Sequence, residues 1–86
     1  MNPMNISPER LTALEGFMRE ISAYKGRGAN MRCAATYASA WLRGERTREQ
    51  LLYTRYNMSG WRGHRASYIL YQIDSIIADT RLQGEK

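Results

Sequence analysis

The segment from Arg43 to Arg65 carries the residues whose types and spacing point most clearly to chemistry, and that chemistry is binding. It holds six arginines against two glutamates, so it accounts for nearly all of the net charge of +5 in a chain of 86 residues. An arginine side chain presents a planar fork that matches phosphates, carboxylates and base edges, and it stacks on aromatic rings. A localised basic segment with interleaved rings is typical of proteins that bind a nucleic-acid backbone. The candidate binding residues are therefore Arg43, Arg46, Arg48, Arg55, Trp61, Arg62, His64 and Arg65.

The order of residue types from Thr47 to Leu70 resembles a helix-turn-helix. The positions that follow that pattern are Leu52, Tyr56, Asn57, Met58, Ser59 and Ala66. The resemblance implies a recognition helix that begins near Ser59, with its N-terminal residues placed for base contacts. Those residues are Trp61, Arg62, His64 and Arg65. Two positions depart from the pattern, because Tyr53 stands where a small residue is expected and Gly63 stands where a buried aliphatic one is expected.

The same segment also suits a second class of function, the binding of another protein. Trp61 and Arg62 are of the residue types enriched at interface hot spots. The alternative is therefore a small inhibitor or adaptor of the kind that phages and mobile elements direct against a host enzyme or nucleoprotein complex. A third interpretation is a solvated arginine face with tyrosines that cover the core, in which Trp61 closes the core from outside. A homo-oligomer that packs through the face of Ala34, Ala35 and Ala38 or through the isoleucine face of the last helix is compatible with either function.

Catalysis and metal binding are not expected, because the residues they need are too few. Cys33 is the only thiol and His64 the only histidine, so a zinc site with four protein ligands cannot be assembled from them. Cys33 lies among alanines, which predicts a buried and inert cysteine. Asp74 and Asp79 are five residues apart and so do not share a helix face. We expect no enzyme, no catalytic residue, no metal and no cofactor.

Two helices are expected in the first half of the chain. Ser7 can cap the first helix, with Pro8 at its first position, and the helix is expected to end at Gly26 or before Gly28. Asn30 can cap the second, which ends at Gly44. Their apolar residues recur at helical spacing, which predicts one buried face on each helix. Those residues are Leu11, Leu14, Met18 and Ile21, then Met31, Ala34, Ala35, Ala38, Trp41 and Leu42.

Two further helices are expected in the second half. The sequence from Thr47 to Gln50 has the form of a capping box, which predicts the start of a short third helix. It ends at a turn in which Asn57 tolerates positive φ. The last helix begins after Ser59 or Gly63 and ends at Gly84. Its buried face is formed by Ala66, Ile69, Leu70, Ile73, Ile76 and Ile77.

These elements predict an all-α fold of about four helices in one domain over residues 1–86, either helix-turn-helix-like or a small bundle. We expect residues 1–6 and 84–86 to be frayed tails. No apolar run approaches the roughly 18 residues that span a bilayer, and the N-terminal segment lacks the pattern of a signal peptide. The sequence therefore predicts a cytoplasmic protein without a membrane partner, whose partner is nucleic acid or a host protein.

Overall fold

Four helices follow one another along the chain in a computed structural model that describes residues 6–84, the side chains of residues 81–84 excepted. They are α1 (Pro8–Ser22), α2 (Ala29–Leu42), α3 (Arg48–Tyr56) and α4 (His64–Gly84). No strand occurs within this range. The expected all-α single domain of four helices is confirmed.

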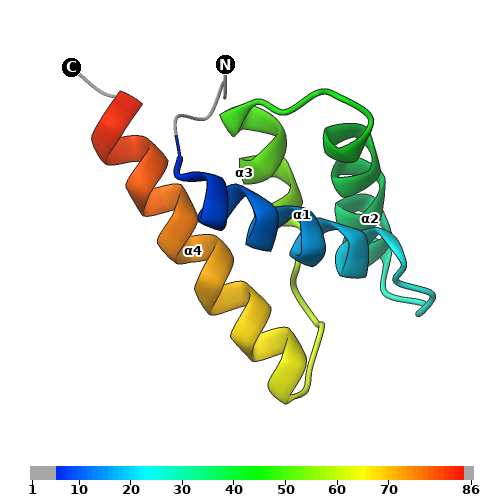
Figure 1. The fold of residues 1–86 in the computed structure, drawn as a ribbon. Coiled ribbons are helices and arrows are strands. Elements are labelled where there is room, and N and C mark those ends of the chain that lie inside the picture. Colours follow the sequence, from blue (N-terminus) through cyan, green and yellow to red (C-terminus); the bar gives the residue numbers. More distant parts are fainter. Residues whose placement is uncertain (1–5, 85–86) are drawn as a thin grey trace.

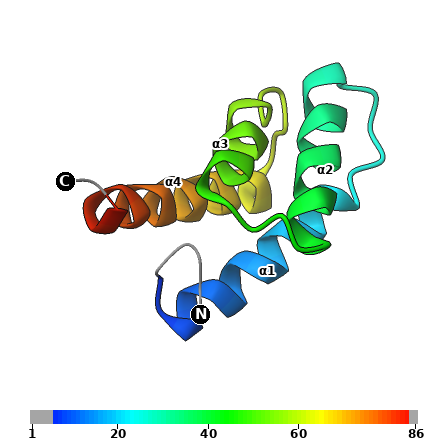
Figure 2. The ribbon, with the colours of Figure 1, turned by 90° about the horizontal axis from the view of Figure 1, so that it is seen from above.

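Helix α1 crosses the domain, and α2 and α3 run in opposite directions beside each other (Figures 1 and 2). In Figure 1, α4 lies along one side and α2 along the other, with α1 and α3 between them. Figure 2 shows the same order from above, with α3 between α4 and α2. The start of α2 and the end of α3 therefore lie at the same end of this helix pair, where the Asn30 side chain donates a hydrogen bond of 2.8 Å to Ser59 Oγ. The α2–α3 loop lies at the other end.

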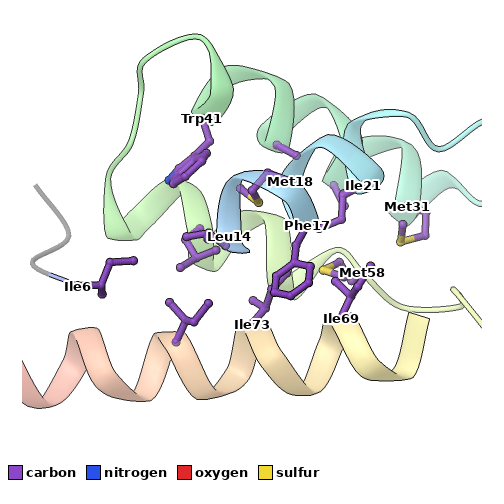
Figure 3. Packing of buried hydrophobic residues seen from close by; sticks show 14 residues of the cluster. Ile6, Leu14, Phe17, Met18, Ile21, Met31, Trp41, Met58, Ile69 and Ile73 are labelled. Carbon is purple, nitrogen blue, oxygen red and sulfur yellow. The ribbon is translucent and has the colours of Figure 1, made fainter. Parts of the chain in front are cut away.

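The core forms between the apolar faces that the helical spacing predicts. Leu14, Met18 and Ile21 of α1 are fully buried, and so are Ile69 and Ile73 of α4. Figure 3 shows these α1 and α4 side chains facing one another, with Trp41 above them. Met31 of α2 and Met58 of the α3–α4 loop lie to one side of them. Because α4 meets the core through one narrow isoleucine face, its remaining faces stay available to polar contacts and to solvent.

The expected caps are confirmed at two helices and corrected at a third. Ser7 accepts a hydrogen bond from the Arg10 amide, and Thr47 accepts one from the Gln50 amide, each at 3.2 Å. At α2 the N-cap is Gly28, without a side-chain cap, so the expectation that Asn30 caps this helix is wrong. The Asn30 side chain instead joins α2 to the α3–α4 loop.

The connection between α3 and α4 differs from that of a helix-turn-helix. It runs over residues 57–63, whereas the turn of that motif has about three or four residues. The left-handed backbone falls on Gly60 (φ 84°) and Gly63 (φ 114°), while Asn57 has φ −98°. Because α4 begins at His64 and not near Ser59, Trp61 precedes the helix instead of standing on a recognition helix.

Two further expectations on burial are wrong. Cys33 is exposed, because the buried positions of α2 include Met31 and Ala34 and place residue 33 on the opposite side. Ile6 is only 7% exposed and belongs to the core cluster, so this residue is not part of a frayed N-terminal tail. The rest of the expected N-terminal tail and residues 85–86 lie outside the described residues, while Gly84 is the last residue of α4.

The isoleucine face of α4 should dominate the attachment of this helix. Replacing Ile73, which is fully buried, by alanine should lower the free energy of unfolding by about 2–5 kcal/mol. Tyr71→Ala, on the solvent side of the same helix and 70% exposed, should change it by no more than about 0.5 kcal/mol. Urea denaturation followed by circular dichroism measures both. Equal losses of stability in the two variants would contradict this packing.

Candidate nucleic-acid interface

Arg46, one of the predicted binding residues, is engaged within the protein. It forms an ion pair with Glu15 of α1, and its guanidinium lies 4.5 Å from the ring centre of Trp41. Trp41 is fully buried, so the guanidinium covers the outer side of the core there. This contact joins α1, the end of α2 and the α2–α3 loop, which gives Arg46 a structural role.

Arg48 and Arg55 both connect α3 to α4. Arg55 donates two hydrogen bonds to the carboxylate of Asp74, at 2.7 and 3.1 Å. Such a bidentate pair fixes direction as well as distance. Arg48 donates from Nε to Thr80 Oγ1 at 3.1 Å. These two predicted binding residues therefore hold the outer edge of α4 against α3.

Arg65 connects the start of α4 to α1. It donates from Nε to Glu20 at 3.0 Å and forms a second contact with the same carboxylate. Its guanidinium lies 5.3 Å from the ring centre of Tyr68 and 5.9 Å from that of Phe17. Further along α4, Arg10 of α1 pairs with Asp79 at 3.0 Å. Both edges of α4 are thus bridged by arginine–carboxylate pairs.

The ion pairs shift the pKa of the two glutamates on α1. The hydrogen bond from Arg46, together with the charges of Arg46 and Arg19, lowers the pKa of Glu15 below its ordinary value of 4.5 against a smaller opposing effect of burial. The hydrogen bond and charge of Arg65 lower the pKa of Glu20 in the same way. The same hydrogen bond raises the pKa of Arg65.

The remaining predicted residues divide between the two ends of the domain. Arg43 is exposed at the end of α2, beside the α2–α3 loop. Arg62 in the α3–α4 loop and His64 at the start of α4 are exposed, and Trp61 is half-buried and packs against the core. The structure therefore brings Trp61, Arg62, His64 and Arg65 together and separates them from Arg43, Arg46 and Arg48.

A second group of cations, which the sequence pattern did not single out, lies in and just after the α1–α2 loop. Lys25 and Arg27 in the α1–α2 loop and Arg32 near the start of α2 are exposed, and none of them forms an ion pair with a described residue. The Asn30–Ser59 hydrogen bond ties this region to the α3–α4 loop that carries Arg62. We call this surface the basic end and define it by Lys25, Arg27, Arg32, Arg62 and His64.

The loop that carries Lys25 and Arg27 has a defined shape. It passes over the half-buried ring of Tyr24, whose hydroxyl accepts a hydrogen bond of 3.2 Å from the Gly28 amide. A Cβ atom at Gly26 would clash with that hydroxyl, so a larger residue there would displace the Tyr24 ring. Lys25 and Arg27 are both exposed on this turn.

The basic end lacks acidic residues. None occurs from Ile21 to Gly44 or from Gln50 to Ile73, and Glu20 nearby is paired with Arg65. Helices α2 and α4, which begin at this end, have no acidic residue in their first turns, whereas Glu9 and Glu49 occupy those of α1 and α3. Since a helix N-terminus is positive, both helices add to the potential. The acid-free intervals are the sequence signal that could have identified this surface.

The described part of the chain holds neither a cluster of metal-ligand side chains nor a membrane-spanning helix. No three histidine, cysteine, aspartate or glutamate side chains within it lie close enough to hold a metal ion together. None of its helices combines the length and the apolar character needed to cross a membrane.

In comparisons with known proteins, no family model, no curated protein and no solved structure matches this chain. The geometry and charge of the basic end are therefore the basis on which a function can be proposed.

The Glu15–Arg46 pair predicts a loss of stability in acid. Because the pKa of Glu15 is lower in the folded state, the unfolded state binds more protons as the pH falls below 4.5, and the free energy of unfolding decreases there. Glu15→Gln should reduce this acid dependence while leaving the helical content at neutral pH intact. Urea denaturation at several pH values between neutrality and about pH 3 measures the effect.

A double-variant cycle supplies the control. In the Arg46→Gln background, Glu15→Gln should produce little further change in the acid dependence, since the partner that shifts the pKa of Glu15 is already gone. Additive changes in the two variants would show that the pair does not act as a unit.

Proposed function

We propose that this protein binds nucleic acid through phosphate contacts of the basic end. The observation that carries the proposal is the exposure of Lys25, Arg27, Arg32 and Arg62 on two loops and the start of a helix, segments that the Asn30–Ser59 hydrogen bond joins and that hold no unpaired acidic residue in the described range. A polyanion is the ligand class whose charge such a surface complements.

The basic end offers two kinds of cationic group to a phosphate. Arg27, Arg32 and Arg62 present guanidinium forks suited to phosphate oxygens, and Lys25 adds a point charge. His64, the first residue of α4, follows Arg62 by two residues and is also exposed. Arg46, Arg48, Arg55 and Arg65 act indirectly in this proposal, because their contacts hold the helices that present the surface.

A protein-binding inhibitor or adaptor is the second candidate. It is favoured by Tyr56 and Tyr71, whose side chains are 71% and 70% exposed. Tyrosine is enriched at protein–protein interfaces, so exposed tyrosines suit contact with a partner protein. An acidic protein surface could dock on the basic end through the same cations. The two candidates separate in a pull-down with and without nuclease, because a stoichiometric protein partner that survives nuclease would favour the second.

Charge removal at the basic end should weaken binding in proportion to the number of phosphates that the protein no longer neutralises. Arg27→Gln, Arg32→Gln and Arg62→Gln should each reduce affinity for a short labelled oligonucleotide, and each should make the slope of log K against log salt shallower by about 0.7 to 0.9. Fluorescence anisotropy over a range of salt concentrations measures both quantities.

Arg43→Gln is the matched control, because it removes the same charge from an exposed residue at the opposite end of α2. It should leave the salt slope nearly unchanged. The absence of binding to both duplex and single-stranded DNA and RNA in about 50 to 100 mM salt would refute the proposal. Equal effects of Arg43→Gln and Arg62→Gln would refute the assignment to the basic end.

A further inference from the structure

Three side chains with rings form a stripe along the solvent side of α4. His64, Tyr68 and Tyr71 follow one another at spacings of four and three residues, which places them on one helix face. His64 is exposed, and Tyr68 and Tyr71 are 48% and 70% exposed. The opposite face carries the buried Ile69 and Ile73. The helix thus turns its apolar residues inward and a row of rings outward.

The middle ring of the stripe is held in a defined orientation. Tyr68 meets Phe17 edge to face, with ring centres 5.9 Å apart and planes at 80°. The Arg65 guanidinium lies 5.3 Å from the Tyr68 ring centre and is itself fixed by Glu20. Tyr71, one turn further on, has no ring contact or hydrogen bond with a described side chain, so its ring is available to an external partner.

The stripe begins at His64, which also belongs to the basic end. Arg62 precedes His64 by two residues, and the interval from Gln50 to Ile73 that contains the whole stripe has no acidic residue. A phosphate chain bound at Arg62 can therefore continue along α4 past Tyr68 without meeting an unpaired carboxylate in that interval. Cations that follow a backbone and rings that take base faces are the two components of single-strand binding sites.

We propose that the ligand of this surface is a single-stranded nucleic acid, whose phosphates contact the basic end and whose bases stack on Tyr68 and Tyr71. This inference rests on the proposed function and narrows it. In a duplex the base faces are covered by neighbouring base pairs, whereas an unpaired strand presents them to side-chain rings. The contribution of the rings to binding therefore distinguishes the two forms of nucleic acid.

The test compares three labelled oligonucleotides of equal length by anisotropy: a base-bearing single strand, a strand of abasic sites with the same phosphates, and a duplex. The base-bearing strand should bind about tenfold more tightly than the abasic strand, as expected for a base–aromatic stack. Tyr71→Leu should remove most of that difference and leave abasic binding unchanged. Tyr71→Phe should retain it, because the ring is preserved. Strands of DNA and RNA with the same sequence show which sugar is preferred.

Tyr53→Leu is the matched control, since Tyr53 is 47% exposed but lies on α3, outside the stripe. It should leave the preference for bases unchanged. Equal binding of the base-bearing strand, the abasic strand and the duplex would overturn this inference, and so would a wild-type preference for bases that Tyr71→Leu leaves intact. In both cases the proposed function stands if Arg27→Gln and Arg62→Gln still weaken binding. If no oligonucleotide binds, the proposed function fails together with this inference.

Discussion

Helix α4 is held on the domain by an isoleucine face flanked on both edges by arginine–carboxylate pairs, and the surface of the protein follows from this arrangement. Ile69 and Ile73 bury one narrow side of the helix. Arg65 and Arg10 then bridge it to α1, while Arg55 bridges it to α3. Partly exposed pairs contribute little stability individually. Their main effect is on orientation, because together they fix the rotation of α4 about its own axis.

The same pairs determine which charges remain for a ligand. Each arginine committed to a carboxylate loses most of its field outside the protein, so a basic stretch of sequence does not translate directly into a basic surface. The acids that take part lie on α1 and in the second half of α4. The positive charge that stays unpaired therefore lies mainly at the end where acidic residues are absent. Part of it comes from Lys25 and Arg27, which lie outside the segment from Arg43 to Arg65.

Local signals in the sequence predicted the helices well. The caps at Ser7 and Thr47 and the isoleucine stripe of α4 depend on residues three or four apart, and the structure reproduces them. The partners of Arg55 and Arg65 lie 19 and 45 residues away, so nothing in their immediate neighbourhood indicates that they are engaged. Sequence spacing alone therefore predicts a binding site that includes structural arginines and omits the α1–α2 loop.

The start of α4 at His64 links the fold to the proposed ligand. Had the helix begun near Ser59, Trp61 and Arg62 would have occupied its first turn. Instead, Gly60 and Gly63 take positive φ and form an open connection in which Trp61 packs against the core. That packing anchors the loop, and the adjacent Arg62 remains exposed. A half-buried ring thereby fixes the position of a solvent-facing cation directly before the row of rings on α4, which is how a rigid scaffold can present a loop residue to a phosphate.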